Sequence, residues 1–159
     1  MKTAVVYYSL TGSCALVAEE IKSGLGADLL RLHTEDEKKR GGFANFFWAG
    51  CVMLGIKKAP LKPYTFNPAA YDLIIIGAPV WAGGPARPIR DFLAEAGITG
   101  KKLALFVCHG GGAGKAPEQL KALLSGNEIS AETSFIYPLK NSETVKQQVA
   151  VWVKGLQAG

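Results

Sequence analysis

The chain has 159 residues, of which 48% are hydrophobic and 19% are charged, and these values exclude a disordered polypeptide and favour one folded domain. The net charge of +5 does not indicate nucleic-acid binding, because the basic residues are spread along the sequence and no recognition motif accompanies them. Three cysteines without a CxxC pair argue against a metal site or a disulfide framework, and no apolar run is long enough for a transmembrane segment. We therefore expect a soluble cytoplasmic protein without a bound metal.

Hydrophobic patterns predict that strands and helices alternate along the chain. Strands are expected at 3–8, 27–33, 71–79, 101–109 and 128–137, and helices at 13–25, 86–96, 115–126 and 142–156. The central strands, such as "LIIIG" at 73–77, lack polar alternation, which is typical of parallel strands covered on both faces. The pattern predicts a single α/β domain over residues 1–159, with a doubly wound, five-stranded parallel sheet and helices on both faces.

One segment, at about residues 34–70, interrupts this alternation. It begins with the charged run "TEDEKKR" and continues with an apolar, aromatic-rich stretch from Phe43 to Ile56. The simplest interpretation is that this stretch forms the second sheet-covering helix. Three functional alternatives stay open: a lid near a ligand, a homodimer face, or a helix on a membrane surface.

Three strand ends carry residues that favour ligand binding. They are "SLTGSC" (9–14), "PVWAGGP" (79–85) and "CHGGGAG" (108–114), which we call the first, second and third loops. In a doubly wound sheet the carboxyl ends of the strands lie at one edge, where ligands bind at the topological switch point. We therefore expect the three loops to be neighbours.

Each loop contains residue types suited to one part of a ligand. The hydroxyls and backbone N–H groups of Ser9–Ser13 stand at a helix N-terminus and suit a phosphate, whereas helix capping alone would need only one hydroxyl. Trp81 can stack on a flat ring or lie in the core. Glycines 110–112 leave the backbone accessible to the edge of a ligand. The third loop lacks the first glycine and the final hydroxyl of a nucleoside-triphosphate loop, and the first loop lacks the dinucleotide pattern GxGxxG.

The first loop resembles the phosphate-binding fingerprint S/T-x-T-G-x-T of the flavodoxin family, and the resemblance covers essentially the whole chain. The chain is similar to the small single-domain flavodoxin-like proteins, whose strand order is 2-1-3-4-5. The family binds flavin mononucleotide (FMN), so the resemblance implies a phosphate in the first loop, an isoalloxazine ring beside the second, and its pyrimidine edge near the third. The implied cofactor-binding residues are Ser9, Leu10, Thr11, Gly12, Ser13, Cys14, Pro79, Val80, Trp81, Ala82, Gly83, Cys108, His109, Gly110, Gly111 and Gly112.

Three departures from the family's pattern bear on function. Cys14 replaces the final threonine of the fingerprint, so a hydroxyl donor becomes a weak thiol donor. The third loop lacks the tyrosine that often covers the second flavin face in electron-carrier flavodoxins. The three loops contain no Asp or Glu, and Lys115 and Arg87 follow closely, whereas electron-carrier flavodoxins are acidic around the flavin. These surroundings penalise an anionic reduced flavin less, which predicts two-electron chemistry.

The sequence supports two main classes of function. The first is an FMN-binding electron-transfer protein or oxidoreductase whose donor or acceptor is NAD(P)H, a quinone-like compound or a redox partner protein. His109 is then the one candidate for proton donation. The second is a flavodoxin-fold interaction or regulatory module with weak or no flavin binding, which Cys14 and the aromatic residues at 43–48 favour. Thiol redox sensing by Cys14 and Cys108 is a weaker third hypothesis, because buried packing explains both cysteines.

Overall fold

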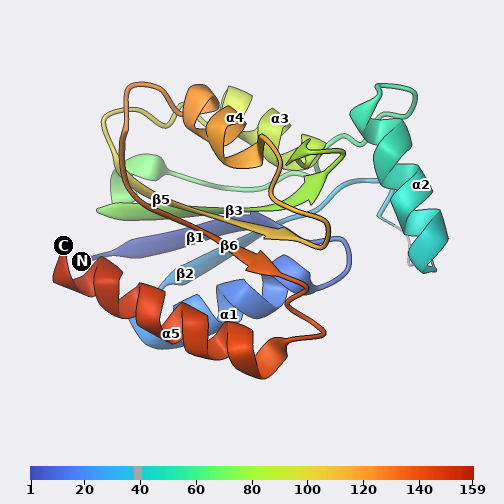
Figure 1. Ribbon diagram of the computed structural model, residues 1–159. Coiled ribbons are helices and arrows are strands. Elements are labelled where there is room, and N and C mark those ends of the chain that lie inside the picture. The colour runs from blue at the N-terminus through green and yellow to red at the C-terminus, as the bar shows by residue number, and fades with distance from the viewer. Residues whose placement is uncertain (38–40) are drawn as a thin grey trace.

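A computed structural model describes residues 1–37 and 41–159 (Figure 1). The strands are β1 (Thr3–Tyr8), β2 (Asp28–Leu32), β3 (Leu73–Trp81), β4 (Gly84–Pro85), β5 (Lys102–His109) and β6 (Glu128–Ile136). The helices are α1 (Ser13–Leu25), α2 (Gly42–Met53), α3 (Arg87–Glu95), α4 (Ala116–Leu123) and α5 (Ser142–Ala158), with a short 3-10 turn at Pro68–Ala70. Every strand and helix predicted outside residues 34–70 is present at nearly the predicted bounds.

The long strands form one parallel sheet in the order β2-β1-β3-β5-β6, and the two-residue β4 pairs antiparallel with β3. Counted along the chain without β4, this is the expected order 2-1-3-4-5. The predicted α/β fold with a doubly wound parallel sheet is therefore confirmed. Its switch point lies between β1 and β3, the two strands from which the chain continues in opposite directions across the sheet.

Helices cover both faces of the sheet (Figure 1). Val5 and Tyr7 of β1 belong to the hydrophobic cluster beneath α1 and α5, whereas Val6 and Tyr8 belong to the cluster beneath α3 and α4. Because successive side chains of one strand point to opposite faces, both sets must be apolar when both faces are covered. This explains the unbroken apolar runs of the central strands.

The segment between β2 and β3 departs from the prediction. α2 is a helix, as expected, but it lies beyond the carboxyl ends of the strands instead of covering a sheet face (Figure 1). Neither of the two clusters against the sheet includes a residue of α2. Three of its four buried residues, Trp48, Ala49 and Val52, form a small cluster of their own with Ala59. The interpretation as a sheet-covering helix is therefore wrong. Among the described residues, no helix is both long and apolar enough to cross a membrane.

Candidate ligand site at the carboxyl ends of the strands

The three loops meet at the carboxyl edge of the sheet, as the sequence predicts. The backbone N–H of Lys115, directly after the third loop, donates a hydrogen bond to the carbonyl oxygen of Gly83 in the second loop over 2.9 Å. The ring of Tyr8, directly before the first loop, lies 5.5 Å from the ring of Trp81, measured between centroids. Segments that are far apart in the sequence therefore surround one small region of the surface.

The first loop is held in shape by Ser9. Its hydroxyl oxygen is buried and accepts hydrogen bonds from the N–H groups of Gly12, at 3.1 Å, and Ala15, at 3.2 Å. The Arg31 guanidinium donates to the Ser9 carbonyl oxygen at 2.9 Å, which ties the loop to the end of β2. Gly12 has φ +105°, a backbone conformation that glycine adopts without strain. Ser9 therefore organises the loop, and its hydroxyl is already engaged within the protein.

The remaining donors of the first loop are available to a ligand. Within the described part of the chain, the backbone N–H groups of Thr11, Ser13 and Cys14 have no hydrogen-bond acceptor. The hydroxyls of Thr11 and Ser13 lie 3.5 Å apart, and neither side chain is buried. These groups converge at the N-terminus of α1, where the helix dipole favours negative charge. This set of orphaned donors fits a phosphate group.

Cys14 and Cys108 lie together in the core instead of at the surface. Both side chains are buried in the cluster beneath α1 and α5. Burial, and then the hydrogen bond with Cys108, raise the pKa of the Cys14 thiol well above its ordinary value. The thiol is therefore protonated at neutral pH and unreactive, which disfavours thiol redox sensing. Any contact of Cys14 with a ligand would come from its backbone.

The second loop is a tight hairpin, a feature that the sequence did not reveal. Val80 pairs with Pro85 and Trp81 with Gly84, so the turn consists of Ala82, with φ +50°, and Gly83, with φ +78°. Two consecutive residues with positive φ define the type I′ turn, which joins twisted antiparallel strands without splaying them. The hairpin rigidly fixes the position of Trp81.

The ring of Trp81 is half-buried and stands between two other aromatic rings. It packs edge-to-face against Tyr8, and against Trp48 of α2 with a centroid separation of 5.8 Å. The Trp48 indole N–H donates to Asp36 over 3.1 Å, which anchors α2 to the end of β2. Trp81 thus lies neither free in solvent nor fully in the core. α2 forms the wall beside it.

The third loop is packed closely against its neighbours. A Cβ atom at Gly114 would lie 2.6 Å from the carbonyl oxygen of Gly83, and one at Gly110 would lie 2.5 Å from the ring of Tyr137. The N–H of Gly112 donates to Nδ1 of His109 at 3.1 Å. Nδ1 is therefore the acceptor, so the neutral ring carries its proton on Nε2 and can donate from there.

A fourth loop, residues 137–141 after β6, belongs to the same edge and was not predicted. The Tyr137 N–H donates to the His109 carbonyl oxygen at 2.8 Å, and the Lys140 amine lies 4.8 Å from the centre of the Tyr137 ring. Leu139 reaches to 3.9 Å from the point where a Cβ of Gly12 would stand. The signal that could have revealed this loop is its position at the carboxyl end of a parallel strand, the same rule that identified the other three.

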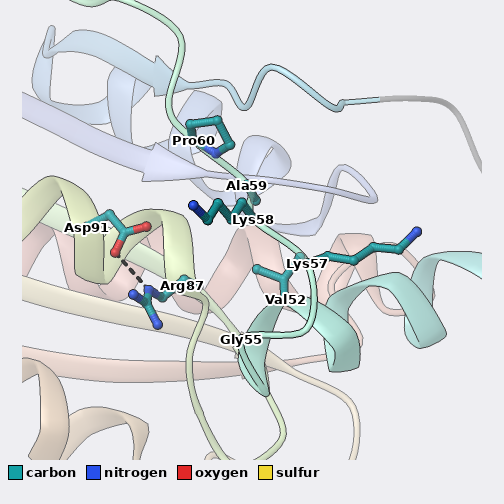
Figure 2. Close-up of a pocket in the computed structure, with 8 residues that line it drawn as sticks. All are labelled: Val52, Gly55, Lys57, Lys58, Ala59, Pro60, Arg87 and Asp91. Atoms are coloured by element: carbon teal, nitrogen blue, oxygen red, sulfur yellow. Dashed lines mark hydrogen bonds and ion pairs between the residues drawn. The ribbon is translucent and has the colours of Figure 1, made fainter.

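A cavity of about 360 Å³ opens beside this edge, between the chain after α2 and the start of α3 (Figure 2). The Arg87 guanidinium donates to the Asp91 carboxylate over 2.8 Å, and the Lys57 amine points away from this pair. None of the eight lining residues belongs to the three loops, so the cavity is separate from the predicted site. The lining consists of Val52, Gly55, Lys57, Lys58, Ala59, Pro60, Arg87 and Asp91.

Comparison with known proteins gives a clear result for the fold. No protein-family model and no curated protein matches the sequence. Solved structures do match: a flavoprotein from Lactobacillus acidophilus NCFM, solved in complex with FMN, has 25% identity and a TM-score of 0.71 over 92% of this chain and 98% of that chain. The flavodoxin, WrbA-like protein from Agrobacterium tumefaciens has 19% identity and a TM-score of 0.61 over 99% and 98%. Two-electron reduced flavodoxin from Megasphaera elsdenii has 18% identity and a TM-score of 0.59 over 96% and 98%.

These matches extend over nearly the full length of both chains and agree with the observed strand order. The resemblance on which the sequence analysis relied is therefore confirmed at the level of the fold. The protein has the flavodoxin-family fold.

Proposed function

We propose that this protein binds FMN and acts as an FMN-dependent oxidoreductase or electron-transfer protein. The observation that carries the proposal is the group of unpaired backbone N–H donors at Thr11, Ser13 and Cys14, at the same sheet edge as Trp81. A phosphate and a flat ring are the two parts of FMN that such a site needs to hold. The match to a flavoprotein that was solved with FMN supports this choice of ligand.

The phosphate-binding role falls to the first loop. The N–H groups of Thr11, Ser13 and Cys14 and the hydroxyls of Thr11 and Ser13 would donate to phosphate oxygens, and the dipole of α1 adds to the attraction. Ser9 holds the loop in the conformation that presents these donors. Arg31, bonded to the Ser9 carbonyl oxygen, supplies positive charge close to the loop. Compared with the family's fingerprint, this donor set lacks only the hydroxyl of the threonine that Cys14 replaces.

The ring-binding role falls to the second and third loops with their neighbours. Trp81 is held in place by the hairpin and by Trp48, so its ring is preorganised for stacking. Tyr137 supplies a second exposed ring beside Gly110, although the third loop itself has no tyrosine. The glycines of the third loop leave backbone donors accessible, and Nε2 of His109 remains a candidate hydrogen-bond or proton donor.

FMN, when bound, would supply the redox chemistry, while the protein sets its orientation and potential. The three loops contain no carboxylate, whereas Arg31 and Lys140 lie close to them. Such surroundings stabilise negative charge and favour two-electron reduction. NAD(P)H, a quinone-like compound or a redox partner protein would act as donor or acceptor. The free, reduced cysteines fit a cytoplasmic location.

The experiment is a parallel titration of the purified protein with FMN and with riboflavin, which lacks the phosphate. We expect FMN to bind and riboflavin to bind at least about tenfold more weakly, a loss of about 1.4 kcal/mol. The double variant Thr11→Ala/Ser13→Ala should lose affinity for FMN but not for riboflavin. Equal affinity for both ligands would contradict the role of the first loop. Absence of binding would instead support the interaction-module hypothesis.

A redox titration of the FMN-loaded protein tests the proposed chemistry separately. A single two-electron step is expected, because the loops lack the carboxylates that would penalise a reduced anion. Two well-separated one-electron steps would contradict this prediction while leaving FMN binding intact.

A further inference from the structure

Basic residues are spread along the whole chain, but the excess of positive over negative charge comes from one segment. Residues 38–71 contain six of the eighteen basic residues and none of the thirteen acidic residues. The rest of the chain has twelve basic and thirteen acidic residues and is close to neutral, so this segment accounts for the basic character of the whole. The six basic residues are Lys38, Lys39, Arg40, Lys57, Lys58 and Lys62. The three that precede α2 directly follow Glu35, Asp36 and Glu37, which offset them in the sequence, whereas Lys57, Lys58 and Lys62 follow α2 without an acidic neighbour.

The helix between these charges exposes large aromatic side chains. Phe43, Phe46 and Phe47 are 82%, 78% and 63% exposed, and we call these three residues the aromatic face. The spacing of three and four residues places them on one side of α2. α2 contains no charged residue over its whole length, although its inner side is already buried against the protein. Leu54 and Ile56, which follow the helix, are 78% and 70% exposed.

A helix that has no charged residue and exposes large apolar side chains is expected to be covered. The inner side of α2 packs against Trp81 and Leu10 through Trp48 and Val52, whereas the aromatic face is exposed to solvent. An exposed apolar patch of this kind marks an interaction surface.

We propose that the aromatic face docks the protein onto the surface of an anionic phospholipid bilayer. The phenylalanines enter the boundary between headgroups and acyl chains, and the exposed Lys57 and Lys58 contact the anionic headgroups. The Lys57 amine points away from the Arg87–Asp91 pair and is not neutralised by it (Figure 2). The helix lies in the interface, because it is too short to span the bilayer.

A second copy of the chain suits this surface less well. A symmetric dimer built around α2 would bring Lys57 and Lys58 of the two copies toward one another. Like charges that face each other across an interface oppose association. Anionic lipid satisfies the apolar and the electrostatic requirement together, because one surface supplies both acyl chains and negative charge.

The test is co-sedimentation of the full-length protein with phosphatidylcholine vesicles that do or do not contain phosphatidylglycerol. Three variants are compared with wild type: Phe43→Ser/Phe46→Ser/Phe47→Ser, Lys57→Gln/Lys58→Gln, and Val151→Ser as a matched control. Val151 is 72% exposed on α5, a helix that covers one face of the sheet and lies apart from α2 (Figure 1), so its replacement removes an exposed apolar group outside the proposed surface. Thermal unfolding of each variant verifies that it is folded.

We expect binding to phosphatidylglycerol vesicles that weakens with salt. The triple serine variant should lose at least about thirtyfold in affinity, since each buried apolar side chain contributes substantially. The double lysine variant should lose about fivefold per lysine removed, and Val151→Ser should bind like wild type. The proposal is overturned if the wild-type protein does not bind the phosphatidylglycerol vesicles. It is also overturned if the triple serine variant binds them as tightly as wild type, because the charges would then suffice for binding without the aromatic face. A dimer that the serine variant dissociates, without vesicle binding, would assign the face to a second copy instead.

Discussion

Replacing Gly114 by alanine tests whether the second and third loops are in contact. Gly114 has φ +55°, and an added Cβ would lie 2.6 Å from the carbonyl oxygen and 2.9 Å from the Cα of Gly83. Both are backbone atoms of the hairpin that carries Trp81, so no side-chain rotation can relieve the contact. The two loops must therefore separate in the variant.

The cost can be worked out from three contributions. Alanine in a left-handed conformation costs about 1 kcal/mol. Separation of the loops weakens the hydrogen bond from the Lys115 N–H to the Gly83 oxygen, which contributes about 1 kcal/mol. Residual overpacking adds to both, so the free energy of unfolding should fall by roughly 2–3 kcal/mol. Because the hairpin positions Trp81, the affinity for FMN should fall as well.

The assay is urea unfolding followed by far-ultraviolet circular dichroism, with Gly111→Ala as the control. Gly111 lies in the same loop, but its φ is not positive and a Cβ there would meet no atom within 4 Å. Its replacement should leave the stability unchanged or raise it by up to about 1 kcal/mol. If Gly114→Ala is as stable as Gly111→Ala, the loops are not in contact and the geometry of the site is wrong.

Three further predictions concern the core, the pH dependence and the ligand site. Gly77→Ala should reduce the free energy of unfolding by about 3 kcal/mol or more, because its Cβ would lie 2.1 Å from the buried ring of Phe106; a near-wild-type urea midpoint would show that this ring can move. Burial, and then the hydrogen bond to Glu95 at 2.6 Å, raise the pKa of Tyr64 above its ordinary 10.0, so the folded state retains the proton longer than the unfolded state. The resulting contribution to the free energy of unfolding is present below pH 10.0 and is lost as the pH rises above it. The urea midpoint of Tyr64→Phe should therefore decline less steeply above pH 10.0 than that of wild type. Parallel curves for the two proteins would disprove this linkage. Trp81→Ala should weaken FMN binding at least about tenfold and remove most of the tryptophan quenching in a fluorescence titration, and retention of both would exclude stacking by this ring.

The alternation of strands and helices could be predicted because both faces of the sheet are covered. A strand such as β3, buried from Leu73 to Ala78, leaves an apolar run that no loop or surface helix would contain. The position of the three loops followed from the same prediction, since parallel strands end at one edge. Assignment of the phosphate role required only local chemistry, the hydroxyls and the glycine at a helix N-terminus.

The rest depended on contacts that no local pattern encodes. The hairpin at Ala82 and Gly83 was not predicted, because alanine is an unusual residue at positive φ. Ser9 was counted among the ligand donors, although its hydroxyl is engaged by two backbone groups of its own loop. Tyr137 reaches the third loop only through long-range folding, and its own surroundings in the sequence do not reveal the contact.

The position of α2 could not be predicted for a different reason, and that reason connects the two proposals. A helix without charged residues and with apolar side chains on every side has little periodic signal for its inner side, so the sequence could not show which residues would be buried. In the structure the two sides of α2 differ. Trp48 packs against Trp81 of the candidate flavin site, whereas Phe46 and Phe47 are exposed to solvent. One element thus contacts the ligand site on one side and presents the aromatic face on the other. A bilayer bound at that face would lie beside the carboxyl edge of the sheet, next to the candidate ligand site.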